Sequence, residues 1–363
     1  MHAKRPAIDC AMEMSDSTRL TQVVHDVHGA QAMAPDRGNA QSRLDETRSF
    51  LALSTVKGLG QKTLFAFANA GRRFSEVLDH GPDIELDRNA VRARADPPVS
   101  SRQWSEICND ALARADVIGS QLDRLGVAII FRENPRFPSQ LLELERPPHW
   151  LFVQGEVELL QRPSVTIVGT RKPTPDGEFL TRYVGACLND WGVPTVSGLA
   201  AGIDQLAHES SLRAGVPTIA VLGTGILEEY PKGAAPLRGH ILGTGGLIVS
   251  EYLPHISYSA ENFVQRNRLQ AGLGRVLIPA EWQRRSGTAH TVRFATQLRR
   301  PIACLRLPEW PEERVMLEPG LGCETGKIFT VPREQVPFDR FVRSALGLSM
   351  PRQAAQLSFF DED

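Results

Sequence analysis

The sequence predicts an α/β fold in which a Rossmann-like parallel sheet, with helices on both faces, follows a small helical region. Short apolar runs alternate with helical patterns from Val165 to Leu305. Each apolar run ends in glycine or small hydroxyl residues, which is typical of strands that enter loops. The helical patterns between the runs are long enough for right-handed crossovers, so we expect successive strands to be parallel.

The composition is that of an ordinary globular protein. The chain has 363 residues, enough for two or three domains, and a formal net charge of −1. Nucleic-acid binding would therefore need a local basic groove. The five cysteines form no Cys-x-x-Cys pair. We expect neither a metal site nor disulfides, in keeping with a reducing, cytoplasmic compartment. No apolar run is long enough to span a membrane, and the N-terminus lacks a signal-peptide core.

The first part of the chain is expected to hold a disordered extension, residues 1–45, and a helical domain, residues 46–125. The turn at Lys57–Gly60 (Lys-Gly-Leu-Gly) separates two helical patterns and resembles a helix-hairpin-helix or SAM-like arrangement. Such a turn can offer backbone N–H groups to phosphate. The alternative is a tight helix connection without a ligand. A longer helical pattern, Trp104–Leu125, closes this domain.

Residues 126–307 are expected to form the sheet domain, and residues 308–363 a C-terminal extension with a short helix near Phe338–Leu348. Strands are expected at Val127–Phe131, Trp150–Val153, Val165–Val168, Pro194–Val196, Thr218–Leu222, Leu247–Val249, Arg275–Pro279 and Ile302–Leu305. Helices are expected at Gly177–Asn189, Gly202–Ala214, Ala235–Leu242, Glu261–Leu273 and Thr288–Arg299.

The loops that follow the strands carry groups suited to an anionic ligand. Gly169 allows close backbone approach, and Arg171 supplies a forked cation. Ser197, Gly198 and the helix start at Gly202 offer backbone N–H groups to an anion. The alternative at Arg171 is a plain turn with a solvated side chain. No Gly-x-Gly-x-x-Gly fingerprint is present, so a redox dinucleotide is disfavoured and no cofactor is expected.

Asp204 and His208 lie four residues apart and so share one helix face. They could contact phosphate or ribose, or act as an acid–base pair. We favour a structural pair, in which an Asp–His hydrogen bond orders the loop. No nucleophile elbow or metal-ligand set accompanies them, so no catalytic residue is assigned.

An aromatic residue and a basic cluster follow in the helix near residue 263. Phe263 with Arg266, Asn267 and Arg268 combines stacking with cations, as in single-stranded nucleic-acid binding. The alternative places Phe263 in the core and pairs one arginine with Glu251 or Glu281. We expect both uses, with one arginine structural and one on phosphate.

A further basic loop precedes the last predicted helix of the sheet domain. Ser286 is placed to cap that helix, and Arg285 and Gly287 flank it, which would suit another phosphate. The alternative is a capped surface loop. Lys232 completes the candidate phosphate-binding residues.

Taken together, these loops resemble the DNA-processing protein A (DprA, also Smf) family, and the chain is identified as a divergent member. The resemblance covers Val127 to about Leu305, with a weaker likeness of the Lys57–Gly60 region to the family's N-terminal helical domain. Ala201 stands where the family usually has arginine. The matching stretches are Val168–Arg171, Ser197–Asp204 with Ala207-His208, Tyr230-Pro231, Ser250–Tyr252, Phe263 through Arg268, Ala271–Leu273 and Glu281 through Ser286–Thr288 to Thr291.

The resemblance implies a non-enzymatic protein that protects single-stranded DNA and loads the recombinase RecA during natural transformation. It also implies a homodimer formed through the sheet domain. By motif, the DNA groove would carry Arg171, Ser197, Gly198, Phe263, Arg266–Arg268, Ser286 and Gly287.

The C-terminal residues Gln356, Leu357, Phe359 and Phe360 resemble the short peptide with which bacterial DNA-metabolism proteins dock on the replicative sliding clamp. The alternative is that both phenylalanines fold back onto the domain.

The rival function is a nucleotide-binding sensor, or an enzyme that processes nucleoside monophosphates on a related Rossmann-like fold. Phosphoribohydrolases of that kind carry Pro-Gly-Gly-x-Gly-Thr followed by a catalytic Glu. Gly243–Gly246 (Gly-Thr-Gly-Gly) only superficially echoes this motif, and no Glu follows at the needed spacing. Competition between small nucleotides and oligonucleotides discriminates the two functions.

Overall fold

The computed structural model describes residues 37–81, 101–310 and 325–350 of the 363-residue chain. The chain divides into two compact units, residues 1–41 and 42–363, and the fold below is that of the second. The predicted clamp-binding peptide, Gln356–Phe360, lies outside the described residues.

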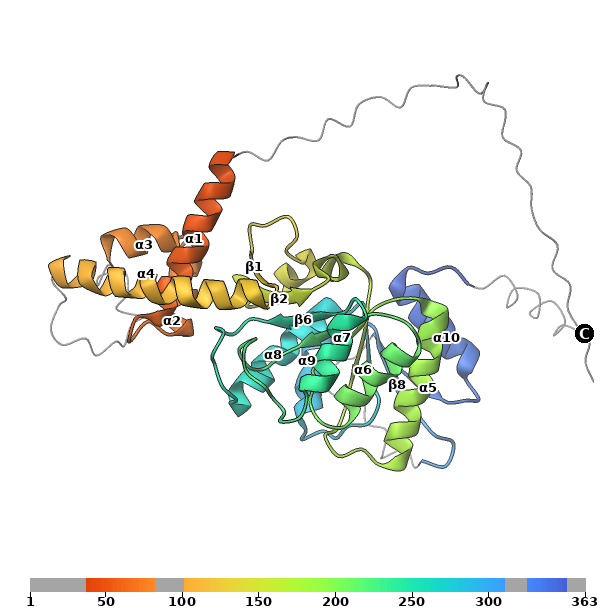
Figure 1. The fold of residues 1–363 in the computed structure, drawn as a ribbon. Helices are drawn as coiled ribbons and strands as arrows, with labels where there is room; N and C mark the ends of the chain where they lie inside the picture. Colours follow the sequence, from red (N-terminus) through yellow and green to blue (C-terminus); the bar gives the residue numbers. More distant parts are fainter. Residues whose placement is uncertain (1–36, 82–100, 311–324, 351–363) are drawn as a thin grey trace, which may run out of the picture. The chain divides into compact units, whose positions relative to one another are not determined.

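The described helices of the N-terminal region confirm that it is helical. They are α1 (Arg37–Thr55), α2 (Gln61–Asn69), α3 (Phe74–His80) and α4 (Ser101–Arg124), shown in red to amber in Figure 1. α1 begins inside the segment that we expected to be disordered. The predicted turn connects α1 to α2, and Gly58 takes a φ of 94° there, a conformation that favours glycine.

The sheet is mostly parallel, as predicted, and its nine strands run in the order β1-β2-β6-β5-β4-β3-β7-β8-β9 within the described residues. Strands β3 to β9 pair in parallel, whereas β2 pairs antiparallel with both β1 and β6. The strands are β1 (Val127–Phe131), β2 (Trp150–Gly155), β3 (Val165–Val168), β4 (Thr195–Ser197), β5 (Thr218–Val221), β6 (Leu247–Ser250), β7 (Val276–Pro279), β8 (Ile302–Arg306) and β9 (Gly326–Thr330).

Helices cover both faces of the sheet, as the alternation of strands and helices predicted (Figure 1). One face packs against α5, α6 and α10, and the other against α8 and α9. α7 packs on β5 and β6. The helices are α5 (Pro175–Trp191), α6 (Ile203–Arg213), α7 (Ala235–Gly243), α8 (Ala260–Leu273), α9 (Gly287–Gln297) and α10 (Gln335–Leu346), with 3₁₀ turns η1 (Ser139–Glu143) and η2 (Val157–Gln161).

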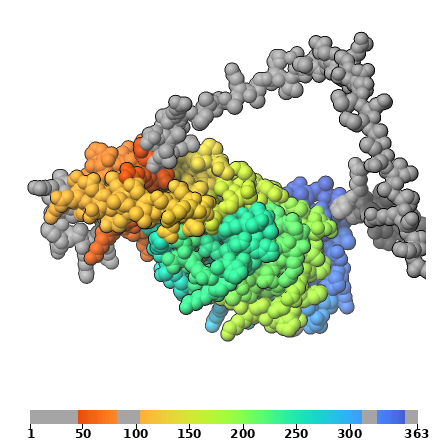
Figure 2. All heavy atoms as spheres, viewed as in Figure 1, coloured from red at the N-terminus to blue at the C-terminus, as the bar shows by residue number. Residues whose placement is uncertain are grey.

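The helical region and the sheet share one hydrophobic cluster. Phe50 of α1 is fully buried, and its ring lies 4.8 Å from that of Trp150 and 5.5 Å from that of Phe131. In Figure 2 the atoms of α4 lie against those of the β1–β2 hairpin, and α4 also contacts β1. The first two strands therefore join the sheet to the helical region.

The strand order reverses at β3. The chain runs from β3 outward through β4, β5 and β6, then returns to place β7 on the other side of β3. In open α/β sheets, ligands bind beyond the carboxyl ends of the strands at such a reversal. The candidate loops after β3, β4, β5 and β7 all emerge at that edge.

Candidate nucleic-acid interface

The loops after β3, β4 and β7 are fastened to one another at the carboxyl edge. The Thr170 N–H donates to the carbonyl of Glu281 at 2.8 Å, and the Ile203 N–H donates to the carbonyl of Thr170 at 3.1 Å. Gly202 has a φ of 85°, and a Cβ there would lie 2.6–2.8 Å from backbone atoms of Thr170 and Arg171. Glycine at position 202 thus lets the β4 and β3 loops touch.

The anion-binding position that we predicted around Gly198 is occupied by a side chain of the protein itself. The Asp204 carboxylate lies close to the Gly198 backbone and to Arg266, and the backbone N–H groups of Gly169 and Gly198 favour its charged form. Complete burial raises the pKa of Asp204, and Arg266 and the two N–H groups partly offset that rise. A Cβ at Gly198 would overlap the Arg266 guanidinium and the Asp204 carboxylate. Glycine at position 198 therefore leaves room for the Arg266 and Asp204 side chains beside the backbone.

Ser197 is likewise turned inward. Its side chain is fully buried, and its hydroxyl donates to the carbonyl of Ile167 at 2.7 Å. This hydrogen bond joins β4 to β3, so the hydroxyl is not presented to a ligand.

The expected Asp204–His208 hydrogen bond is replaced by other contacts. His208 is fully buried, and its Nδ1 lies 2.7 Å from the hydroxyl oxygen of Thr218 on β5. Burial, with a contribution from the charge of Arg266, lowers the pKa of His208 to about 3. Sharing a helix face did not pair the two side chains, because Asp204 in the first turn lies beside the Gly198 backbone, whereas His208 contacts Thr218 of β5.

Both arginines of the basic cluster on α8 are buried, so the expectation that one of them faces phosphate is not met. Arg266 donates from Nη1 to the carbonyl of Val221 at 2.6 Å, and burial lowers its pKa to about 10. Arg268 donates to the Glu251 carboxylate at 2.6 Å, and the two side chains are 8% and 3% exposed. The alternative pairing with Glu251 is thus confirmed. Between them, Asn267 donates to the carbonyl of Gly287 at 3.0 Å and links α8 to α9.

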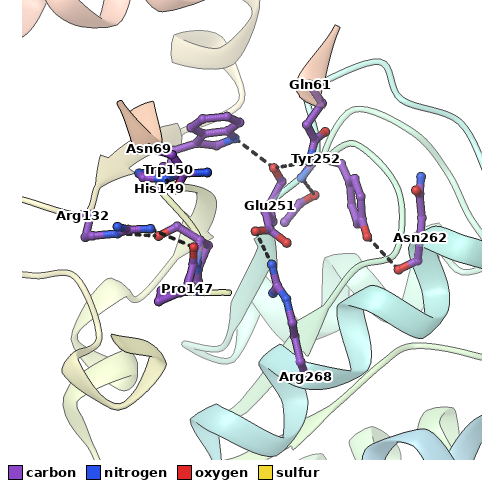
Figure 3. Close-up of polar contacts among 12 residues, drawn as sticks. Gln61, Asn69, Arg132, Pro147, His149, Trp150, Glu251, Tyr252, Asn262 and Arg268 are labelled. Carbon is purple, nitrogen blue, oxygen red and sulfur yellow. Dashed lines mark hydrogen bonds and ion pairs between the residues drawn. The ribbon is translucent and has the colours of Figure 1, made fainter. Parts of the chain in front are cut away.

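Glu251 is also the centre of a junction between the helical region and the sheet (Figure 3). Its carbonyl accepts from Trp150 Nε1 at 2.9 Å and from Gln61 Nε2 at 3.3 Å. Gln61 Oε1 in turn accepts from the N–H of Leu253 at 3.2 Å. The Tyr252 hydroxyl donates to the Asn262 carbonyl at 2.7 Å. The loop between β6 and α8 is therefore fixed from both of its sides.

Sequence reasoning missed this junction. Gln61 directly follows the hairpin turn, where a helix start suggested a ligand, yet its side chain is directed at the protein. A second polar contact of the region joins His149 Nε2 to Asn69 Oδ1 at 2.7 Å. Burial, aided by the charge of Arg132, lowers the pKa of His149 to about 4.

Phe263 lies where three loops meet. The Cζ atom of Arg171, from the β3 loop, lies 5.4 Å from its ring centroid. The rings of Tyr230 and Tyr258, from the loops after β5 and β6, lie 5.0 and 5.2 Å from it. A Cβ at Gly223 would lie 2.7–2.9 Å from the Phe263 ring, so glycine lets this ring rest on the backbone. Neither tyrosine was singled out for stacking, because both lie in irregular loops.

The remaining candidate cations are at the surface. Arg171, Lys232 and Arg285 are exposed, and so is Gly287. Ser286 caps α9 as predicted, since its hydroxyl accepts from the N–H of Ala289 at 3.4 Å. The exposed Arg171 guanidinium beside an aromatic cluster, with further exposed cations in neighbouring loops, suits a ligand that combines phosphates with flat bases.

The described residues contain neither a candidate metal site nor a candidate membrane-spanning helix. No group of three or more His, Cys, Asp or Glu side chains there could hold a metal ion. No helix of the described segments has the length and apolar character to cross a membrane.

Comparison with known proteins places the chain among relatives. The family described as DNA recombination-mediator protein A matches residues 128–318, just over half of the chain. Protein Smf of Synechocystis sp. is 40% identical over 184 residues, 50% of this chain and 46% of that protein. Protein Smf of Escherichia coli is 37% identical over 172 residues, 47% of this chain and 46% of that protein. The match therefore spans about half the length of these relatives.

The fold extends the likeness beyond the aligned segment. The X-ray structure of DNA processing protein A (DprA) from Streptococcus pneumoniae matches with a TM-score of 0.56 at 26% identity, over 81% of this chain and 97% of that chain. The loops quoted for the resemblance lie inside the matched residues. The chain therefore belongs to the DNA recombination-mediator protein A family.

Proposed function

We propose that this protein binds single-stranded DNA without sequence preference and serves DNA processing in natural transformation. The observation that carries the proposal is the placement of exposed Arg171 over Phe263, beside the half-exposed ring of Tyr258. A guanidinium next to aromatic rings matches a chain of phosphates with unpaired bases. Lys232 and Arg285 extend the positive surface along the same edge. These cations support local binding of a polyanion by a chain of net charge −1.

We place Arg171, Lys232, Arg285 and the α9 start at Ser286–Gly287 on the DNA backbone. The buried residues Ser197, Gly198, Arg266, Asn267 and Arg268 and the half-buried Gly169 shape the loops behind them, and Gly202 joins two of those loops. The role is binding, not catalysis. Asp204 and His208, the candidate acid and base, are both buried with internal partners.

Fluorescence anisotropy with a labelled strand of ~20 nucleotides tests the proposal, because phosphate contacts make affinity fall steeply with salt. We expect tight, salt-sensitive binding to the single strand and weaker binding to the matching duplex. Arg171→Ala should weaken binding and reduce the slope of log K against log salt by about 0.7, the value for one phosphate contact on a single strand.

The matched control is Arg213→Ala. Arg213 is also exposed, pairs with Glu209 in its own helix, and ends α6 at the opposite edge of the sheet. Its removal should leave affinity and slope unchanged. Equal binding by the parent and Arg171→Ala contradicts the groove assignment. If the parent does not bind the single strand even at low salt, the DNA role fails. Competition by small nucleotides would instead favour the rival sensor function.

We carry two family properties to this chain as proposals, RecA loading onto the bound strand and homodimer formation. From the C-terminal peptide we further propose that Gln356–Phe360 dock on the sliding clamp, and we place all three activities in the cytoplasm. RecA filament assembly on DNA with and without the protein, sedimentation equilibrium, and clamp binding by the chain with Phe359 and Phe360 changed to alanine test them in turn.

A further inference from the structure

The aromatic side chain expected to stack on bases is itself covered. Phe263 is 7% exposed, because Tyr230, Tyr258 and Arg171 lie against its ring and Gly223 lies beneath it. A base cannot reach a ring enclosed in this way. Phe263 therefore acts as a support for the groups around it.

Tyr258 has the opposite character. It packs against two rings, at 4.6 Å from Tyr230 and 5.2 Å from Phe263, yet remains 45% exposed. The Tyr230 and Tyr258 rings are stacked, with 20° between their planes. A ring held by two neighbours loses little conformational entropy when a third flat group binds, so it is organised for binding before the ligand arrives.

The position of Tyr258 relative to charge also matters. Arg171 and Tyr258 contact the same Phe263 ring, from different loops. Because both lie within 5.4 Å of the Phe263 ring centroid, a strand whose phosphate reaches Arg171 can bring a base to Tyr258. Lys232, two residues beyond Tyr230, is exposed on the same loop. The surface offers aromatic area and cations together, as a polyanion with flat bases requires.

We propose that Tyr258, braced by Tyr230 and Phe263, is a base-stacking subsite for one nucleotide of a single strand. This inference rests on the proposed function and adds the residue that contacts a base. Because every base has an aromatic face, the subsite favours unpaired bases without reading their sequence. It also disfavours a duplex, whose bases are already stacked on one another.

The test compares two ligands of equal length and charge, a ~20-nucleotide thymidine strand and the same backbone carrying abasic sites. We expect the parent to bind the thymidine strand about tenfold or more tightly than the abasic strand, which is what base–aromatic stacking contributes. Tyr258→Leu keeps the apolar character but removes the aromatic face. It should lose about tenfold in affinity for the thymidine strand and little for the abasic one, with an unchanged salt slope. Tyr258→Phe should retain the parent's preference.

Phe179→Leu is the matched control, since Phe179 is a 48%-exposed aromatic on α5 that stacks on Tyr183. Its affinity for both strands should equal the parent's. Thermal melting of each variant establishes that it is folded. We expect all of them to fold, because each substitution changes an exposed ring.

Two results would overturn the inference in distinguishable ways. If Tyr258→Leu binds both strands as the parent does while Arg171→Ala binds weakly, Tyr258 is not a stacking subsite and the proposed function stands. In that case its exposed ring is free for a protein partner. If the parent binds neither strand at low salt, the proposed function fails and the subsite fails with it.

Discussion

Replacing Arg268 with methionine tests whether the arginine cluster is structural. Methionine keeps the apolar stem but leaves the Glu251 carboxylate, only 3% exposed, without its partner. Removing one member of a buried ion pair typically costs about 3–5 kcal/mol, because an unpaired charge stays out of water. With a urea m-value of about 3 kcal/mol per molar, the unfolding midpoint should fall by about 1–1.7 M.

The loss should depend on pH, and its direction follows from Glu251. Burial raises the pKa of Glu251 above the ordinary value of a glutamate, and Arg268 is the main group that opposes the rise. Without Arg268, the folded-state pKa rises further. A carboxyl with a raised folded pKa contributes stability that is fully present below its unfolded pKa and is lost as pH rises through the folded value. The variant should therefore be closer to the parent at pH 5 than at pH 8.

Urea unfolding followed by tryptophan fluorescence at both pH values measures the effect. In the double variant Glu251→Leu with Arg268→Met no charge remains unpaired, and it should regain most of the loss. The exposed-site control is Arg213→Met, with no measurable change expected. A midpoint for Arg268→Met equal to the parent's at pH 8, or a deficit that does not shrink at pH 5, would refute the reasoning.

Two other substitutions probe the edge of the sheet and its core. Gly223→Ala should displace the Phe263 ring, which lies 2.7–2.9 Å from the added Cβ. Anisotropy should then show single-strand binding weakened by about tenfold, a loss within the range of one base–aromatic stack. Unchanged affinity would mean that the position of the Phe263 ring does not affect binding. His208 has a pKa lowered to about 3 by burial, so the stability it contributes is present above its unfolded pKa near 6.5 and is lost as pH falls. His208→Gln keeps a hydrogen-bonding group beside Thr218 but does not titrate. Its melting temperature should fall less than the parent's between pH 7 and pH 4.5, and parallel curves for the two proteins would contradict this account.

The parts of the fold set by local pattern were predictable. The strands from β3 to β8 follow apolar runs, and observed boundaries such as Val165–Val168 agree with the predicted ones. The partner of each strand is not a local property, so the antiparallel addition of β1 and β2 beside β6 was not foreseen. β9 was missed because Gly326–Thr330 combines a lysine and two small polar or glycine positions with little apolar alternation.

The sequence predicted the location of the candidate site better than the contacts of its side chains. Loop chemistry located the carboxyl edge and Arg171, which depend on strand ends. Sequence could not reveal which charges turn inward. Asp204 lies against the Gly198 backbone that looked available to a ligand, and Arg268 pairs with Glu251, seventeen positions earlier in the chain. Whether a side chain is buried depends on tertiary packing, so the sequence pattern of a basic cluster is the same whether the folded protein buries or exposes it.

The hydrophobic cluster around Phe50 determines whether the helical region and the sheet can be separated into stable fragments. This cluster runs without interruption from the helical region into β2, β5 and β6, so a cut near residue 125 would open an apolar face on each fragment. Fragments made there should aggregate, whereas the whole should unfold as one cooperative body. A partner that binds α2 and displaces Gln61 would also displace the backbone that leads from β6 to Tyr258, because Gln61 is hydrogen-bonded to it. The helical region is thus coupled to the proposed DNA-binding edge.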